Sequence, residues 1–388
     1  MRKGSLLIVI TLIIGIAWSQ LRPVSDKTDT DPRYVGSFSR LAELLSDRGI
    51  EGYAQAAGPR DFSFPEDHGP HRDFRNEWWY ITGNLDGGND ERFGFELTIF
   101  RFSLTPAQDH DPNASAWRTN QVYIGHFAIT DVGNASFHVA QRYARGSLGL
   151  AGAQAKPLQV WLEDWSIEAK NNAWQINASD KDMAIDLTLS PLKPPVLNGI
   201  DGWSQKSSEP GNASYYYSVP RLRTVGTLQI NNANYSVTGL SWFDHEWGST
   251  GLSKEQQGWD WFALHLSDGS DLMFYSLRKN DGSHDPYSAG TWITADGQSM
   301  HLGSDDVDIE VEEHWDSPNG GTYPSAWRLR IPRIDLDLRL RPVLDAQELH
   351  TIVRYWEGAV DVVGQKAGMP VEGRGYVELT GYALPDPG

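Results

Sequence analysis

Apolar and polar residues alternate with a period of two along most of the chain, and Asp-Gly, Asn-Asn and proline separate the alternating stretches. This alternation is typical of antiparallel strands that pack one face on a core. Many such strands at short spacing favour barrels or sandwiches, so we predict an all-β protein. The stretches are "WWYITGNLDGG", "RFGFELTIFRFSL", "QVYIGHFAITDV", "MAIDLTLSPL", "GTLQINNANYSVTGLSWF" and "WRLRIPRIDLDLRLRP".

The beginning of the chain departs from this pattern. "MRKGSLLIVITLIIGIAW" has two cations before an apolar run from Ser5 to Trp18. The run is about 14 residues long, which suits a signal peptide and is short for a membrane span. Ala17 and Ser19 fit the −3 and −1 positions of a cleavage site. We therefore expect residues 1–19 to be a signal peptide, with an uncleaved N-terminal anchor as the alternative.

Two pairs of similar stretches occur in the same order in the two halves of the chain. "WYITGNLDG" corresponds to "WFALHLSDG", and "IDLTLSPL" corresponds to "LDLRLRPV". Repeated stretches at a constant order indicate duplication of one β unit, and chance similarity between amphipathic strands is the alternative.

We predict two domains of this β type, residues 61–238 and 239–388. Before them, residues 20–60 form a linker with a short amphipathic helix, because Leu41, Leu44 and Leu45 have helical spacing.

Composition limits the compartment and the partners. The formal net charge of −18 repels phosphate backbones and anionic lipid, so nucleic acid is an improbable partner, and membrane contact is expected only through an uncleaved signal segment. No cysteine occurs among the 388 residues, so neither a disulfide nor a lipid-attachment cysteine is available. With the signal segment, these features predict a periplasmic or secreted bacterial protein.

Ionisable residues stand among bulky aromatics in "SWFDHEWG". We expect this octapeptide to be a strand that enters the second domain, with Trp242, Asp244 and Glu246 on one face. Two carboxyls beside a tryptophan can push their pKa values apart and leave one protonated as a general acid. The structural alternative is that one of them pairs with an arginine such as Arg221 or Arg278.

Aromatic residues are dense in four further stretches, "NEWWYITG", "SYYYSVPRL", "YWEGAVDVVG" and "GRGYVELTGY", the last two of which also carry Glu357 and Glu378. Such residues can line an elongated apolar pocket, or they can fill small barrels. The 16 tryptophans favour a cavity. The expected substrate-binding residues are Trp78, Trp79, Tyr80, Tyr217, Arg221, Trp242 and Trp261.

Other catalytic chemistries lack their motifs. The chain has no Gly-x-Ser-x-Gly elbow, no phosphate-binding glycine loop and no His-Glu-x-x-His. His245 fits a structural histidine better than a metal ligand, and the 11 histidines lack ligand-like spacing. We therefore expect no metal site.

The aromatic stretches, together with "SWFDHEWG" and "GWDWFALHLSDGSDLMFYSLR", resemble the AttH and hydroxyneurosporene synthase (CrtC) family of lipocalin-like proteins, often labelled predicted secreted hydrolases. The resemblance spans roughly residues 60–385. It implies two lipocalin-like β units and cofactor-free chemistry on apolar molecules. Its carotenoid branch hydrates an isoprenoid double bond, and fungal relatives include Diels–Alderases and a hydratase of a plant phenolic.

The resemblance also implies a role for one residue. In the hydratase branch the aspartate of the motif matching "WFD" is thought to protonate the alkene, which makes Asp244 the candidate acid, with Glu246 beside it as a second catalytic candidate. Aromatic faces such as Trp79, Tyr217 and Trp242 can stabilise the resulting carbocation.

Three functions remain open from the sequence. The first is an exported hydratase or hydrolase that acts on an isoprenoid, carotenoid or lipid-like molecule without a cofactor. The second is a non-catalytic periplasmic carrier of an apolar ligand that works with an ABC transporter, as the AttH side of the family implies. The third is a structural envelope protein with filled barrels.

Overall fold

Strands dominate the chain in a computed structural model, which describes residues 50–106, 115, 119–351 and 354–383. These residues belong to a unit that spans Ser37–Pro385. The expected signal peptide and the helix around Leu41 lie outside the described residues. No helix in the described ranges is long and apolar enough to cross a membrane.

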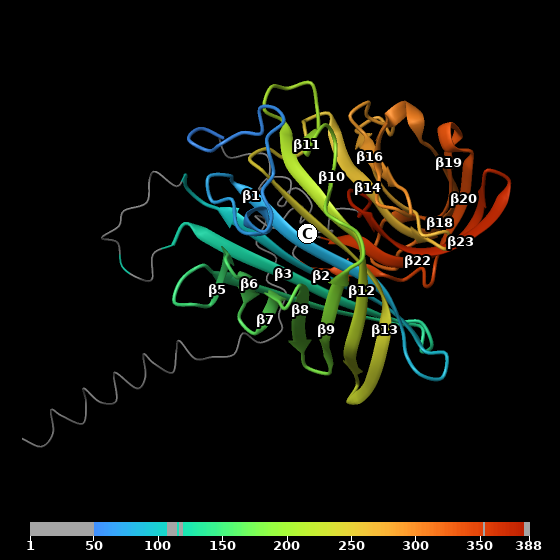
Figure 1. Ribbon diagram of the computed structural model, residues 1–388, viewed down its shortest axis with the longest axis horizontal. Helices are drawn as coiled ribbons and strands as arrows, with labels where there is room; N and C mark the ends of the chain where they lie inside the picture. The colour runs from blue at the N-terminus through green and yellow to red at the C-terminus, as the bar shows by residue number, and fades with distance from the viewer. Residues whose placement is uncertain (1–49, 107–114, 116–118, 352–353, 384–388) are drawn as a thin grey trace, which may run out of the picture. The chain divides into compact units, whose positions relative to one another are not determined.

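The all-β prediction is confirmed, because two curled antiparallel sheets hold the described strands. The described 3₁₀ turns are η2 (Glu66–His68), η4 (Ser304–Asp306) and η5 (Pro332–Ile334). In Figure 1 the strands of the first sheet run from blue to yellow and those of the second from yellow to red.

The first sheet has 13 strands in the described chain, in the order β4-β3-β2-β1-β13-β12-β9-β8-β7-β6-β5, with β10 and β11 paired to β12. All described pairings in it are antiparallel. The strands are β1 (Asn76–Asp86), β2 (Arg92–Ser103), β3 (Gln121–Asp131), β4 (Ser136–Arg145), β5 (Ala151–Ala155), β6 (Leu158–Leu162), β7 (Trp165–Lys170), β8 (Ala173–Asp180), β9 (Met183–Pro191), β10 (Val196–Leu197), β11 (Trp203–Gln205), β12 (Ala213–Ile230) and β13 (Ala233–Gly248).

The second sheet has 10 strands in the described chain, in the order β17-β16-β15-β14-β23-β22-β20-β19-β18, with β21 paired to β22. The strands are β14 (Gln256–Leu266), β15 (Asp271–Lys279), β16 (Ala289–Ile293), β17 (Ser299–Gly303), β18 (Asp308–Asp316), β19 (Thr322–Ile331), β20 (Leu336–Pro342), β21 (Glu348–His350), β22 (Arg354–Lys366) and β23 (Met369–Leu379).

The two strand orders correspond to each other, as the predicted internal repeat requires. In each sheet the first four strands form a meander, and the first of them pairs with the last strand of its half. The repeated stretches occupy equivalent positions, β1 with β14 and β9 with β20. Duplication of one β unit therefore explains the similarity better than chance.

The passage between the sheets lies after the position expected from the sequence. The expected boundary between residues 238 and 239 falls inside β13, which pairs along its length with β1 and β12. The chain leaves the first sheet after Gly248 and begins the second at Gln256. "SWFDHEWG" is therefore the end of a first-sheet strand rather than the start of the second half.

Side-chain alternation creates three buried apolar clusters. One lies inside the first curled sheet, one inside the second, and one between them, where a face of each sheet meets the other. The sheets approach closely there, because a Cβ added to Gly94 of β2 would lie 2.7 Å from the Cβ of Ala359 in β22. The cluster between the sheets includes Tyr80, Trp242, Trp261, Met273 and Tyr376.

The inner side of the first sheet is occupied by the segment that precedes β1. The Trp79 indole nitrogen donates to the carbonyl of His68 over 2.9 Å, and Tyr215 donates to the carbonyl of Gly58 over 3.0 Å. The Phe64 ring packs edge-on against Tyr217. The inside of this curled sheet is thus filled by the protein's own chain.

Candidate active site

A cavity of about 160 Å³ lies between the two sheets, at one end of the cluster they share. That volume has room for on the order of ten waters or one organic molecule. From the first sheet its apolar wall includes Trp78, Tyr80, Phe100, Ile124 and Tyr216. From the second sheet the wall includes Trp259, Trp261, Tyr275, Leu277 and Tyr355. Ionisable side chains that border it are His126, Lys206, Asp244, Glu246, Glu357 and Glu378.

In the second half of the octapeptide, every second residue of β13 borders the cavity, from Asp244 to Gly248. Asp244 and Glu246 border the cavity, whereas Phe243 and Trp247 belong to the cluster inside the first sheet. Adjacent strands continue the row, because Tyr80 of β1 and Ser218 of β12 stand directly opposite Asp244. The carboxylates thus share one face, as a period of two requires.

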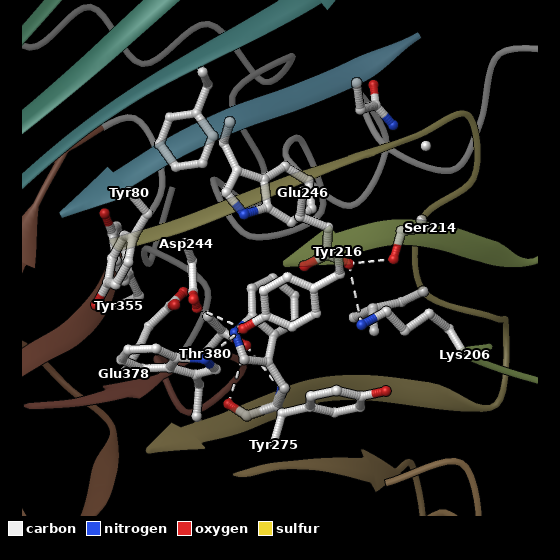
Figure 2. Close-up of a pocket in the computed structure, with 18 of the residues that line it drawn as sticks. Tyr80, Lys206, Ser214, Tyr216, Asp244, Glu246, Tyr275, Tyr355, Glu378 and Thr380 are labelled. Atoms are coloured by element: carbon white, nitrogen blue, oxygen red, sulfur yellow. Dashed lines mark hydrogen bonds and ion pairs between the residues drawn. The ribbon is translucent and has the colours of Figure 1, made fainter. Parts of the chain in front are cut away.

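Three donors hold the Asp244 carboxyl. The Trp242 indole nitrogen donates to Oδ1 over 2.7 Å, and the Ser218 hydroxyl donates to the same oxygen over 2.5 Å. The Tyr216 hydroxyl donates to Oδ2 over 2.5 Å and itself accepts from the Trp261 indole nitrogen over 3.0 Å. Figure 2 shows Asp244 and Tyr216 side by side in this arrangement. The carboxyl is therefore fixed in orientation without being sealed from the cavity.

Burial raises the pKa of Asp244 to about 7, against the lowering effect of those three hydrogen bonds. Among the described residues, no lysine, arginine or histidine forms an ion pair with it. Arg221 pairs instead with Asp271, and Arg278 with Asp260. Asp244 is therefore a carboxyl that can hold and release a proton near neutral pH.

Glu246 has a different environment. Its Oε1 lies 3.1 Å from the Lys206 ammonium nitrogen and accepts a hydrogen bond from Ser214 (Figure 2). Lys206 also lies 3.9 Å from the centre of the Tyr275 ring. Burial opposes the charge of Lys206, but Glu246 and Tyr275 outweigh it and raise its pKa. Glu246, unlike Asp244, is therefore paired with a lysine at the cavity wall.

Comparison with known proteins identifies the family. Residues 55–382 match the family described as AttH-like. This chain belongs to the AttH-like family. It is 32% identical to a candidate AttH from Nitrosomonas europaea whose crystal structure aligns over 85% of this chain and 100% of the other, with a TM-score of 0.75.

A second structure shares the fold of this AttH-like protein. Kievitone hydratase from Nectria haematococca aligns over 87% of this chain and 97% of its own, with a TM-score of 0.63 and 17% identity. Among curated proteins, none matches the sequence. The resemblance stated from the sequence is confirmed as to family and lipocalin-like fold.

The expected binding residues of the AttH-like chain divide between two faces. Trp78, Tyr80 and Trp261 border the cavity. Trp79 and Tyr217 do not border it, which corrects the expectation. Alternation along β1 and β12 points their side chains to the opposite face, into the cluster inside the first sheet. Those two cannot stabilise a cation in this cavity.

The other two expected binding residues lie behind or away from the wall. Trp242 supports Asp244 from the cluster between the sheets. Arg221 lies at a β-bulge of β12, where its guanidinium contacts the Asp271 carboxylate at 2.7 Å. It joins the sheets and does not border the cavity, which corrects its expected role in binding.

Several residues of the cavity were not selected from the sequence as site residues. Glu357 and Glu378 are direct neighbours on β22 and β23. His126 of β3 contacts the Tyr355 hydroxyl through Nδ1 at 2.5 Å. The two glutamates lie in the aromatic stretches near the C-terminus. An ionisable residue among aromatics, as in "SWFDHEWG", could have identified them as site residues. His126 stands in an ordinary alternating strand that carries no such signal.

One group of described residues has ligand atoms close enough together to hold a metal ion, namely His71, Glu77 and His245. Glu77 Oε1 lies 2.8 Å from His71 Nδ1 and 3.0 Å from His245 Nε2, and its Oε2 accepts from Arg101 over 2.7 Å. An ion would have to replace these contacts beside a buried guanidinium. The geometry fits a closed ion-pair network on the inner face of the first sheet, away from the cavity.

Proposed function

We propose that this AttH-like protein is a hydratase that acts on an apolar molecule with a carbon–carbon double bond and needs no cofactor, with Asp244 as the acid. The observation that carries the proposal is the Asp244 carboxyl itself. It borders an aromatic cavity, forms no ion pair with a cation of the described chain and is held by three donors. The fold shared with kievitone hydratase supports the reaction class, and the apolar wall supports the class of substrate.

The chemistry begins with a proton transfer. Asp244 gives its proton to one alkene carbon, whose π electrons form the new C–H bond, and the other carbon becomes a cation. Trp78 and Trp261 in the wall can stabilise that cation through their ring faces. Water then adds through oxygen and loses a proton, which restores Asp244. Trp242, Ser218 and Tyr216 stabilise the carboxylate that exists between these steps.

Isotope incorporation tests the proposal. We would incubate the protein in deuterium oxide with geraniol, squalene and kievitone, and examine each by mass spectrometry for a deuterium on carbon and for the mass of one added water. We expect both with wild-type protein on at least one probe. In Asp244→Asn we expect both to fall by about 100-fold or more, as for loss of a general acid.

Stability separates this proposal from a structural role for Asp244. The variant keeps an oxygen for Trp242 and Ser218 but takes the acceptor of the Tyr216 hydroxyl away. At pH 8 it avoids burying a carboxylate, which offsets that loss, so its melting temperature should stay close to that of wild type. A large fall in melting temperature, with the affinity for these probes unchanged, would end the catalytic proposal. Tight binding of a probe with no turnover in wild type would favour the carrier instead.

A further inference from the structure

A pair of glutamates faces Asp244 across the cavity. Glu357 and Glu378 are directly opposed on β22 and β23, and Trp261 of β14 continues their row. The facing row on the first sheet contains Tyr80 and Asp244. In Figure 2 the Glu378 carboxyl points toward the part of the cavity where Asp244 lies. Carboxyl groups from both sheets thus border a cavity whose wall is rich in aromatic residues.

The hydrogen bonds of Glu357 are incomplete. Its Oε2 accepts from the Tyr80 hydroxyl over 2.9 Å. Its Oε1 is buried and has no hydrogen-bond partner within the described chain, and the residue borders the cavity. An unpartnered buried polar atom costs about 1–3 kcal/mol. Glu96 Oε2 is also unpartnered in the described chain, but Glu357 differs from Glu96 in bordering the cavity.

The surroundings of the pair disfavour two negative charges. Glu96 of β2 is a further, buried carboxyl whose charge acts on both, and no described lysine, arginine or histidine forms an ion pair with any of these three glutamates. Burial raises the pKa of Glu378 to about 8 and that of Glu357 well above its ordinary value. When Glu357 is protonated, its hydrogen is expected on Oε1, because Oε2 accepts from Tyr80 and Oε1 has no partner in the described chain.

We propose that Glu357 and Glu378 hold the water molecule that adds to the substrate, and that Glu378 returns the proton of that water to Asp244. Glu357 donates to the water oxygen from Oε1, and the Glu378 carboxyl accepts one of its hydrogens. A buried water molecule normally needs two to four partners, and the two glutamates would supply two of them. This inference rests on the hydratase function and adds two catalytic residues to it.

The step balances without any other reactant. After Asp244 has protonated the alkene, a lone pair of the water oxygen forms the C–O bond to the cationic carbon. The proton released from that oxygen goes to one oxygen of Glu378, while the hydrogen on its other oxygen goes to the Asp244 carboxylate. Alkene and water become an alcohol, and all three carboxyls recover their initial protonation.

Neutron diffraction from crystals exchanged into deuterium oxide tests the water site without a substrate. We expect a deuteron on Glu357 Oε1 that donates to a water molecule also bonded to Glu378. An ionised Glu357, or a protonated one with no water within hydrogen-bond distance, would overturn the proposal. This measurement decides the question even if none of the probes is turned over.

Paired variants test the catalytic part. Glu357→Gln and Glu378→Gln keep the shape of the side chains and cannot pass a proton between two oxygens. With a probe that wild type hydrates, we expect each to lower incorporation of oxygen from ¹⁸O-water by about 100-fold, while deuterium still enters the alkene carbon through Asp244. Glu96→Gln is the comparison variant: Glu96 is as buried as Glu357, does not border the cavity and acts on the pair through its charge, so this change should retain oxygen incorporation.

The outcomes separate the two proposals. Loss of oxygen incorporation with retained deuterium exchange in both glutamine variants supports the water site. Unchanged oxygen incorporation in both variants overturns it and leaves Asp244 as the acid. If the wild type incorporates neither isotope from any probe, the hydratase function fails, and the neutron result alone decides whether the glutamates bind water.

Discussion

Buried ionisable residues fall into two groups with opposite electrostatics. Inside the first sheet, Glu77 is buried, but the Arg101 charge and hydrogen bonds from His245 and His71 lower its pKa well below the ordinary value. In the cavity, Asp244, Glu357 and Glu378 form no ion pair with any described residue, and burial raises their pKa values. The first group holds charges that secure the fold, and the second holds protons that can move.

Asp67 belongs to the first group, and its ionisation contributes to the stability of the fold except at low pH. Burial opposes its ionisation, yet hydrogen bonds from His71, the Ser63 amide and Arg60 outweigh it and lower its pKa to about 2 from an ordinary 3.8. A carboxyl with a lowered pKa stabilises the fold above its unfolded-state pKa, and this contribution disappears as the pH falls through the folded-state value.

We expect Asp67→Asn to lower the free energy of unfolding by about 2 kcal/mol at pH 6, and we expect the difference from wild type to vanish between about pH 4 and pH 2. Chemical denaturation across that range measures it. A difference that stayed constant with pH would mean that the side chain acts through its shape and not through its charge.

For single residues, the sequence was informative where one short stretch contained all the residues that indicate the role. The motif in "SWFDHEWG" indicated Asp244, and alternation correctly put Glu246 on its face. The roles of Glu357 and Tyr80 could not be derived in that way, because these residues are 277 positions apart and the hydrogen bond between them exists only in the folded chain. Ionisation in a buried site depends on all of its neighbours, which no short stretch contains.

Strands in this protein bury both faces over part of their length. On β1 and β13 one face packs inside the first sheet and the other packs against the second sheet. The sequence predicted the strands, because apolar residues at a period of two mark them. It could not distinguish the cavity face from the inner face, since both carry aromatics, and Trp79 and Tyr217 were therefore expected on the wrong side.

The contact between β2 and β22 depends on a glycine. A Cβ at Gly94 would meet Ala359 at a distance that packed atoms do not adopt. We expect Gly94→Ala to force the two sheets apart locally and to lower stability by about 1–3 kcal/mol. Thermal melts measure this loss. Gly88, in the preceding turn, has open space around it, so Gly88→Ala is the control and should melt close to wild type.

If Gly94→Ala melted like that control, the sheets would be able to shift apart freely, and the cavity between them could not hold its groups in fixed positions.

Ion pairs join the two sheets, and these pairs differ in how far they are exposed to solvent. Asp271 of β15 is buried, and its oxygens contact the Lys193 ammonium and the Arg221 guanidinium, each at 2.7 Å. The pair Arg92–Asp361 also connects the sheets, but its side chains are 30% and 47% exposed. Solvent weakens the second pair, so the buried group must contribute most of the ionic stabilisation between the sheets.

We expect Asp271→Asn to lower the free energy of unfolding by about 3 kcal/mol, because it leaves the buried Lys193 and the partly buried Arg221 without their carboxylate. Asp361→Asn should change it by at most about 1 kcal/mol. Denaturant titration followed by tryptophan fluorescence compares them. Equal effects of the two changes would show that burial does not set the strength of these contacts.

The correspondence between the two strand orders has a consequence for descent. Each half supplies one row of the cavity, Asp244 from one and the glutamate pair from the other, so neither half contains the complete set. An ancestor with a single unit could have formed such a cavity only as a dimer, with identical residues in both rows. Fusion of the two copies freed each row to change alone, and an acid could then evolve on one side while its water-binding partners evolved on the other.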